Sequence, residues 1–116
     1  MEKVISPEVG KVNPKIVGRS PQTIAQMAGI TIPTNTKIII GIETKVGKDV
    51  PFSLEKLSPV LALYKVQSSD EAKSLCLQLL NLGGRGHTLS IHTENDKLAK
   101  EFALDLPVSR IVVNTM

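Results

Sequence analysis

Four side chains of this chain are of types that commonly carry chemistry: Glu55, Cys76, His87 and His92. Glu55 stands just before a turn-forming Ser-Pro pair, and the apolar run LALYKV follows that pair. Pro59 suits the first residue of a strand, because its missing N–H costs no ladder hydrogen bond there. The pattern therefore places the Glu55 carboxylate at the mouth of a sheet, where a polar group can face a ligand. One carboxylate is not a mechanism, so the other three side chains matter.

Cys76 is a nucleophile by type, but its position favours a structural role. It lies inside a predicted helix on the apolar face, four residues after Ala72 and three before Leu79. A reactive thiolate needs a helix N-terminus or a cationic neighbour, and some exposure to solvent. Free cysteines are commonly buried. Cys76 is therefore predicted to fill the core, and no catalytic residue is predicted in this chain.

The two histidines belong to one predicted strand, residues 87–93. Because His87 and His92 are five residues apart, their side chains point to opposite faces, and the strand alone cannot offer both to one metal ion. No metal site is therefore predicted. His87 follows the turn GGRG, where its side chain can face a cleft or can cap the strand with backbone partners. The turn itself is expected to end a helix, because a phosphate-binding loop would need a helix after it.

Composition narrows the classes of partner. The net charge is +3, the basic residues are interleaved with acids, and aromatic residues make up only 3%. Nucleic-acid binding is disfavoured, because there is neither a basic stripe nor a set of aromatic side chains for base stacking. No apolar run approaches the roughly 20 residues of a membrane span, and the N-terminus lacks a signal-peptide core. A single cysteine rules out an internal disulfide and suits a cytoplasmic protein.

Helices and strands alternate along most of the sequence. Spacing and capping signals predict a helix over 21–28, strands over 37–43 and 59–66, a helix capped by Ser68, a strand over 87–93, a helix capped by Thr93 and a strand over 110–115. The β-α-β-α-β order predicts parallel strands with right-handed helical crossovers. The expected fold class is α/β, a three-layer sandwich with a mostly parallel sheet.

Two further expectations concern the limits of this domain. Residues 1–19 are broken by Pro and Gly, which predicts an extended lead-in. Separately, the β-branched run 37–43 predicts a strand that is buried on both faces. The last strand stops at Met116 with no tail. We therefore expect residues 20–116 to be a partial domain cut from a larger protein.

Four pieces of the sequence in this order and spacing resemble the CoA-acylating aldehyde dehydrogenases: IVGRSPQTIAQMAGI, EKLSPVLALYKV, GGRGHTLSIHT and SRIVVNT. The similarity covers about residues 12–116 and includes the aldehyde-dehydrogenase half of bifunctional aldehyde–alcohol dehydrogenases. It implies an oxidoreductase that converts an aldehyde, CoA and NAD(P) to acyl-CoA and NAD(P)H through a Cys thioester. In the family the catalytic Cys lies upstream of this segment, and Cys76 does not align with it. The chain is thus similar to the C-terminal part of the catalytic domain, and alone it is expected to be inactive.

The resemblance also implies cofactor-binding roles for three residues. Glu55 matches the carboxylate that hydrogen-bonds the nicotinamide ribose. Leu57 matches a position near the nicotinamide that is aromatic in many relatives. His87 matches a histidine of the acylating subgroup close to the active-site cleft, which implies a contact with cofactor or substrate. NAD or NADP and coenzyme A are implied as substrates of the parent enzyme, and this chain is expected to hold none of them tightly.

A second interpretation is a non-catalytic α/β module used for assembly or ligand binding. A parent gene that extends upstream through the catalytic Cys favours the enzyme, whereas a gene that starts at Met1 favours the module. A receiver-like domain is disfavoured, because no acidic pocket follows the first strand. The enzyme interpretation implies the rest of the parent aldehyde dehydrogenase as a partner. It also implies a homo-oligomer, because a partial sheet exposes strand edges that pair with other chains.

Overall fold

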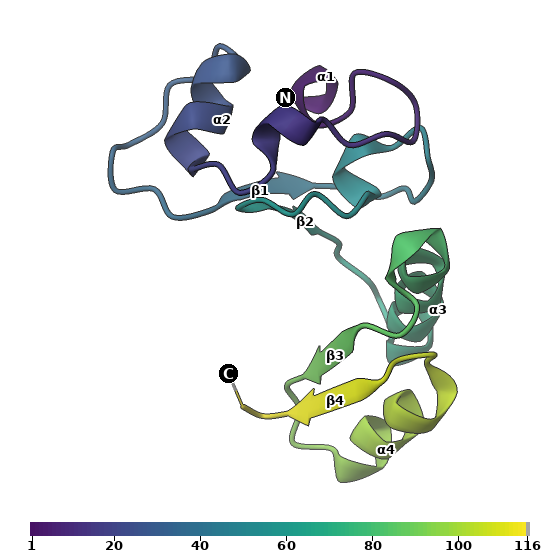
Figure 1. The fold of residues 1–116 in the computed structure, drawn as a ribbon. Coiled ribbons are helices and arrows are strands. Elements are labelled where there is room, and N and C mark those ends of the chain that lie inside the picture. The colour runs from purple at the N-terminus through teal and green to yellow at the C-terminus, as the bar shows by residue number, and fades with distance from the viewer. Residues whose placement is uncertain (116) are drawn as a thin grey trace. The chain divides into compact units, whose positions relative to one another are not determined.

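The structure is a computed structural model that describes residues 1–115 (Figure 1). The chain divides into two compact units, Met1–Lys65 and Val66–Met116. Met116, the last residue of the predicted partial domain, lies outside the described residues. In chain order the elements are α1 (Glu2–Ile5), η1 (Pro14–Ile16), α2 (Pro21–Met27), β1 (Ile39–Ile42), η2 (Pro51–Ser53), β2 (Val60–Leu63), α3 (Ser69–Leu79), η3 (Leu80–Gly84), β3 (Thr88–Ile91), α4 (Asp96–Asp105) and β4 (Arg110–Val113).

In the first unit, β1 and β2 form a parallel two-stranded ribbon in which Ile39 lies opposite Val60. The helices α1 and α2 lie on one face of this ribbon (Figure 1). The buried core on that face consists of Ile5, Ile16, Ile24 and Val60. One residue each comes from α1, η1, α2 and β2, so four separate segments of the chain hold the unit together.

The N-terminal residues are more structured than an extended lead-in. The segment 1–19 contains α1 and the 3-10 turn η1, and it buries Ile5 and Ile16 completely. Helical segments of three or four residues are too short to show a periodic apolar pattern, so no sequence signal predicts them. The division into residues 1–19 and 20–116 remains a prediction.

The helix predicted over 21–28 is confirmed as α2. The Ser20 hydroxyl accepts a hydrogen bond from the Thr23 amide at 3.2 Å, and Pro21 is the first helical residue. Gly29 follows the C-cap with φ of +68°, a left-handed conformation that glycine adopts at little cost. Local capping signals were therefore sufficient to predict this helix.

The strand β1 is not buried on both faces. Ile39 and Gly41 face the core, whereas Ile40 and Ile42 are 52% and 72% exposed. The β-branched run was correctly assigned as a strand, but a run of apolar residues does not show whether both faces are covered within this chain. Here the helices of the first unit cover only one face.

In the second unit, α4 connects two parallel strands, β3 and β4, with Leu89 opposite Ile111. The buried apolar residues are Ala99, Phe102 and Leu106. Lys73 of α3 lies 2.8 Å from the Asp105 carboxylate and 5.5 Å from the centre of the Phe102 ring. This lysine therefore ties α3 to α4.

The caps of the two longer helices agree in part with the sequence. The Ser68 hydroxyl accepts from the Glu71 amide at 3.1 Å, as predicted, while the Glu71 carboxylate accepts from the Gln67 amide. The prediction for the next helix was wrong by two residues. Asn95, not Thr93, is the N-cap, and its side chain accepts from the Leu98 amide at 3.0 Å. The Thr93 hydroxyl instead accepts from the Asn95 amide in the turn before the helix.

The described strands form two two-stranded sheets, β1–β2 and β3–β4. Both pairs are parallel, which confirms the α/β class with parallel strands. The order of elements predicts strand direction, but sequential strands are neighbours in only about two-thirds of cases. The three-layer sandwich remains a prediction. Within residues 1–115, no helix has both the length and the apolar composition needed to cross a bilayer.

Candidate functional site

The loop 54–59 presents two of the predicted cofactor-binding residues. Glu55 is exposed, and Leu57 is 64% exposed. Leu57 has φ of +48°, in the left-handed region that few leucines adopt. Its carbonyl accepts a hydrogen bond from the Gly18 amide at 3.0 Å, which holds this unusual backbone turn against the segment before α2.

Lys56 lies between these two exposed residues and is only 8% exposed. Its ammonium donates hydrogen bonds to the carbonyls of Phe52 at 2.5 Å and Leu54 at 2.8 Å. Burial lowers the pKa of Lys56 below its usual range. Sequence reasoning missed this residue, because lysine is ordinarily a surface residue and no pattern in the sequence marks it as buried.

His87 belongs to the second unit and is exposed. Its amide donates to the Gly84 carbonyl at 3.1 Å, and its own carbonyl accepts from the Ser109 amide at 3.1 Å. The Gly86 amide donates to the Pro107 carbonyl at 2.9 Å, so the glycine-rich turn is fixed to the turn before β4. The helix-ending role of this turn is confirmed, since the π-helical turn η3 continues α3 and stops at Gly84.

Glu55 and His87 share a position relative to their own strands. Glu55 precedes β2 and His87 precedes β3, so each lies near the amino end of a parallel strand. Open α/β sheets usually bind ligands outside the carboxyl ends of their strands. The position in the sheet therefore gives these residues no independent support as ligand contacts.

Cys76 is partly buried in α3, and burial raises the pKa of its thiol above the usual range. A raised pKa leaves little thiolate at neutral pH, which argues against a nucleophile. Among residues 1–115, no group of three His, Cys, Asp or Glu side chains is placed to hold a metal ion. His92 instead lies 3.4 Å from the Ser90 hydroxyl on β3.

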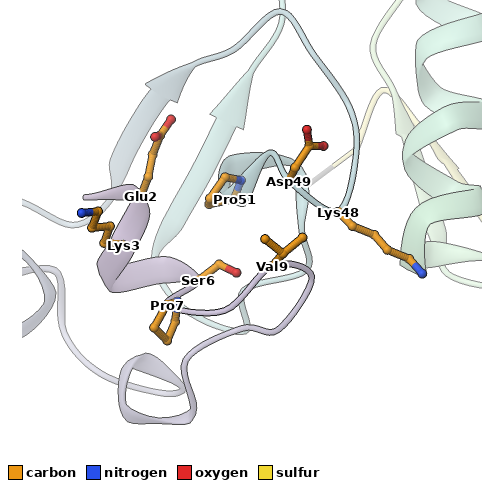
Figure 2. Close-up of a pocket in the computed structure, with 8 residues that line it drawn as sticks. All are labelled: Glu2, Lys3, Ser6, Pro7, Val9, Lys48, Asp49 and Pro51. Carbon is orange, nitrogen blue, oxygen red and sulfur yellow. The ribbon is translucent and has the colours of Figure 1, made fainter.

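A surface hollow of about 180 Å³ lies elsewhere in the first unit (Figure 2). Its lining mixes acidic, basic and apolar side chains from the N-terminal segment, the loop before η2 and the first residue of η2: Glu2, Lys3, Ser6, Pro7, Val9, Lys48, Asp49 and Pro51. A second hollow of about 290 Å³ shares Glu2, Asp49 and Pro51 with it. Neither hollow is lined by the three predicted site residues.

Comparison with known proteins shows close relatives. The chain is 52% identical over 88 residues to an aldehyde-alcohol dehydrogenase of Clostridium acetobutylicum, covering 76% of this chain and 10% of that protein. It is 38% identical over 105 residues to an acetylating succinate-semialdehyde dehydrogenase of Clostridium kluyveri, covering 90% and 23%. A solved acetylating aldehyde dehydrogenase from Geobacillus thermoglucosidasius superposes with a TM-score of 0.93 at 49% identity, covering 98% of this chain and 25% of that one. The chain is homologous to a segment of the acylating aldehyde dehydrogenases.

The family resemblance predicted from the sequence is thereby confirmed. The chain spans only about a tenth to a quarter of the length of these acylating aldehyde dehydrogenases. No protein-family profile matches it. The roles of Glu55, Leu57 and His87 are not decided by these similarities and stay predictions.

Proposed function

We propose that this chain is part of an enzyme that converts an aldehyde, CoA and NAD(P) to acyl-CoA and NAD(P)H. The observation that carries the proposal is the match to the G. thermoglucosidasius enzyme, which extends over 98% of this chain at 49% identity. A segment that keeps both the backbone path and about half of the side chains of an enzyme is expected to have the same role in the whole protein.

In this proposal, Glu55 and Leu57 contact the nicotinamide end of the cofactor. An exposed carboxylate can accept hydrogen bonds from the two ribose hydroxyls, and an exposed leucine two residues away offers an apolar surface to the nicotinamide ring. These residue types and their exposure fit a dinucleotide, which supplies the hydride acceptor when bound. For His87, which is exposed, the proposal is a contact with cofactor or substrate.

The nucleophile comes from outside this segment. Cys76 is partly buried with a raised thiol pKa, so it does not supply the activated thiolate that thioester formation needs. We therefore propose that residues 1–116 act together with the rest of the parent aldehyde dehydrogenase, as a homo-oligomer in the cytoplasm. By themselves they form no NADH.

The uncovered face of the β1–β2 ribbon supports this dependence on a larger protein. Ile40, Ile42, Leu61 and Leu63 are all at least 45% exposed and alternate with the core-facing residues of the two strands. We call these four residues the outer ribbon face. Contiguous exposed apolar surface of this kind marks a contact site in folded proteins.

A segment-exchange experiment tests the proposal. Residues 1–116 replace the matching segment of the G. thermoglucosidasius enzyme, and NADH formation is followed with and without aldehyde and CoA. We expect this chimaera to form NADH only when both substrates are present, and the isolated chain to form none. A chimaera that folds and assembles but lacks CoA-dependent activity would overturn the proposal and favour the non-catalytic module.

A further inference from the structure

Two exposed side chains flank a buried one in the loop before β2. Glu55 and Leu57 are exposed, whereas Lys56 between them is 8% exposed. An interior position is unusual for lysine, whose long side chain normally keeps its ammonium group in water. The burial of Lys56 therefore needs partners that compensate for lost solvation.

Backbone carbonyls of the neighbouring 3-10 turn provide that compensation. The Lys56 ammonium donates to the carbonyls of Phe52, inside η2, and of Leu54, its C-cap residue. Carbonyls at the end of a helical turn lack intrahelical partners, and lysine side chains commonly satisfy them. The two acceptors lie on either side of Ser53 and lead directly into Glu55, so the ammonium fixes the backbone that enters the loop.

The turn η2 is itself fixed to the ribbon. The Phe52 ring lies against Gly41 of β1. The Ser53 hydroxyl also donates a hydrogen bond to the Val50 carbonyl at 2.7 Å, which ties the turn to the loop before it. On the other side of Lys56, the Leu57 carbonyl accepts from the Gly18 amide. The backbone on both sides of Glu55 is thus held by hydrogen bonds to other residues: the Leu54 carbonyl by Lys56, and the Leu57 carbonyl by Gly18.

We propose that Lys56 is a positioning residue that orients Glu55 and Leu57 toward the nicotinamide end of the cofactor. The inference rests on the proposed function, which assigns Glu55 to the ribose. Lys56 acts from beneath the loop: its hydrogen bonds to η2 hold the backbone so that the carboxylate and the leucine face outward. Loss of those bonds frees the loop and misplaces the carboxylate.

The first experiment measures the loop in the isolated 116-residue chain without cofactor. Lys56→Met keeps the length of the apolar stem but removes the donors. We expect the order parameters of the Glu55 and Leu57 amides in ¹⁵N relaxation to fall from about 0.85 to below about 0.6. Lys37→Met, at an exposed lysine before β1, is the matched control and should leave both amides rigid. Rigid amides in the Lys56→Met chain would overturn the inference.

The second experiment measures NAD binding to the chimaera by calorimetry. Lys56→Met and Glu55→Gln are each expected to weaken NAD about tenfold, which is the usual effect of one lost hydrogen bond to a charged group. The double variant should be little weaker than either single variant, because Lys56 acts through Glu55. CoA affinity should stay unchanged in all three.

The outcomes separate the inference from the function on which it rests. If Glu55→Gln weakens NAD but Lys56→Met does not, or if the two effects add fully, Lys56 is not a positioning residue. If Glu55→Gln leaves NAD affinity unchanged, the assignment of Glu55 to the ribose fails and the inference fails with it. Lys56→Gln, which keeps a shorter amide donor, replaces the Met variant if that variant does not fold, and the same criteria apply.

Discussion

The ring of Phe52 occupies the space where any side chain larger than that of Gly41 would stand. A Cβ placed on Gly41 would lie 2.3 Å from Cε1 of Phe52, far inside the van der Waals contact distance. Gly41 is on β1 and Phe52 is in η2, so this contact seats the 3-10 turn on the ribbon. The glycine is therefore needed for close approach and not for an unusual backbone angle.

Gly41→Ala is expected to destabilise the chain by about 1–3 kcal/mol, the usual effect of overpacking a core. Urea unfolding followed by circular dichroism measures this change. Gly83→Ala is the control, because nothing lies within 4 Å of a Cβ built there. Phe52→Leu should relieve the clash, so Gly41→Ala should be less damaging in that background. Equal destabilisation by the two alanine variants would show that the ring does not limit this position.

Two serines in the same region should differ in how their replacement by alanine changes the free energy of unfolding. The buried Ser53 hydroxyl accepts from the Gly47 amide at 3.2 Å and lies within donating distance of the Val50 carbonyl. Within residues 1–115, the buried Ser58 hydroxyl has no hydrogen-bond partner. Ser53→Ala should lower the free energy of unfolding by about 1–3 kcal/mol, whereas Ser58→Ala should leave it unchanged or raise it. A large loss of stability in Ser58→Ala would contradict this expectation, because it would show that the Ser58 hydroxyl is hydrogen-bonded.

The thiol of Cys76 should react slowly in the folded chain. Burial raises its pKa, so less thiolate is present at pH 8 than in a free cysteine. Iodoacetamide should modify the folded chain more slowly than the chain in urea, because the folded chain partly buries the sulfur and holds less thiolate. In the chimaera, Cys76→Ala should keep CoA-dependent NADH formation. Loss of that activity in a folded variant would contradict the assignment of Cys76 to packing.

The same shift predicts a pH dependence of stability. A raised folded-state pKa means that the fold favours the protonated thiol. This contribution is complete below the unfolded pKa, near 8.5 for cysteine, and it is lost as pH rises through the folded value. The Cys76→Ala chain should therefore lose less stability than the parent chain between pH 8 and 10. Identical losses over this range would show that the thiol is not coupled to folding.

Local signals in the sequence predicted much of the fold. The cap at Ser20, the cap at Ser68 and the helix-ending glycines depend on residues within four positions of one another, and each was confirmed. The family resemblance depended on four longer motifs, and the comparison with known proteins confirmed it. The cap of α4 was missed because Thr93 and Asn95 are both good caps two residues apart, and only the tertiary structure selects one of them.

Features that depend on distant segments could not be predicted in this way. The apolar run of β1 predicted a strand but not the exposure of Ile40, because that exposure depends on which segments cover the ribbon. The burial of Lys56 depends on the path of η2 across β1, and that path follows from a contact between Gly41 and Phe52, eleven positions apart. The cofactor-binding roles of Glu55, Leu57 and His87 came from the resemblance, because exposure does not distinguish a ligand contact from an ordinary surface residue.

Polar substitutions on the outer ribbon face should have different effects in the isolated chain and in the chimaera. Ile40 and Leu61 are direct neighbours across the two strands and are 52% and 48% exposed. Replacing both with Thr keeps strand propensity but removes apolar surface. In the isolated chain this double variant should bind less hydrophobic dye and self-associate less. In the chimaera it should lower the melting temperature, because each such side chain contributes about 1.5–3 kcal/mol when it is buried.

Val9→Thr, at a 77% exposed residue of the same unit, is the control and should change neither dye binding nor the melting temperature much. If the double variant is as stable as its parent in the chimaera, the outer ribbon face is open to solvent in the whole enzyme, and the dependence on the rest of the aldehyde dehydrogenase needs another explanation.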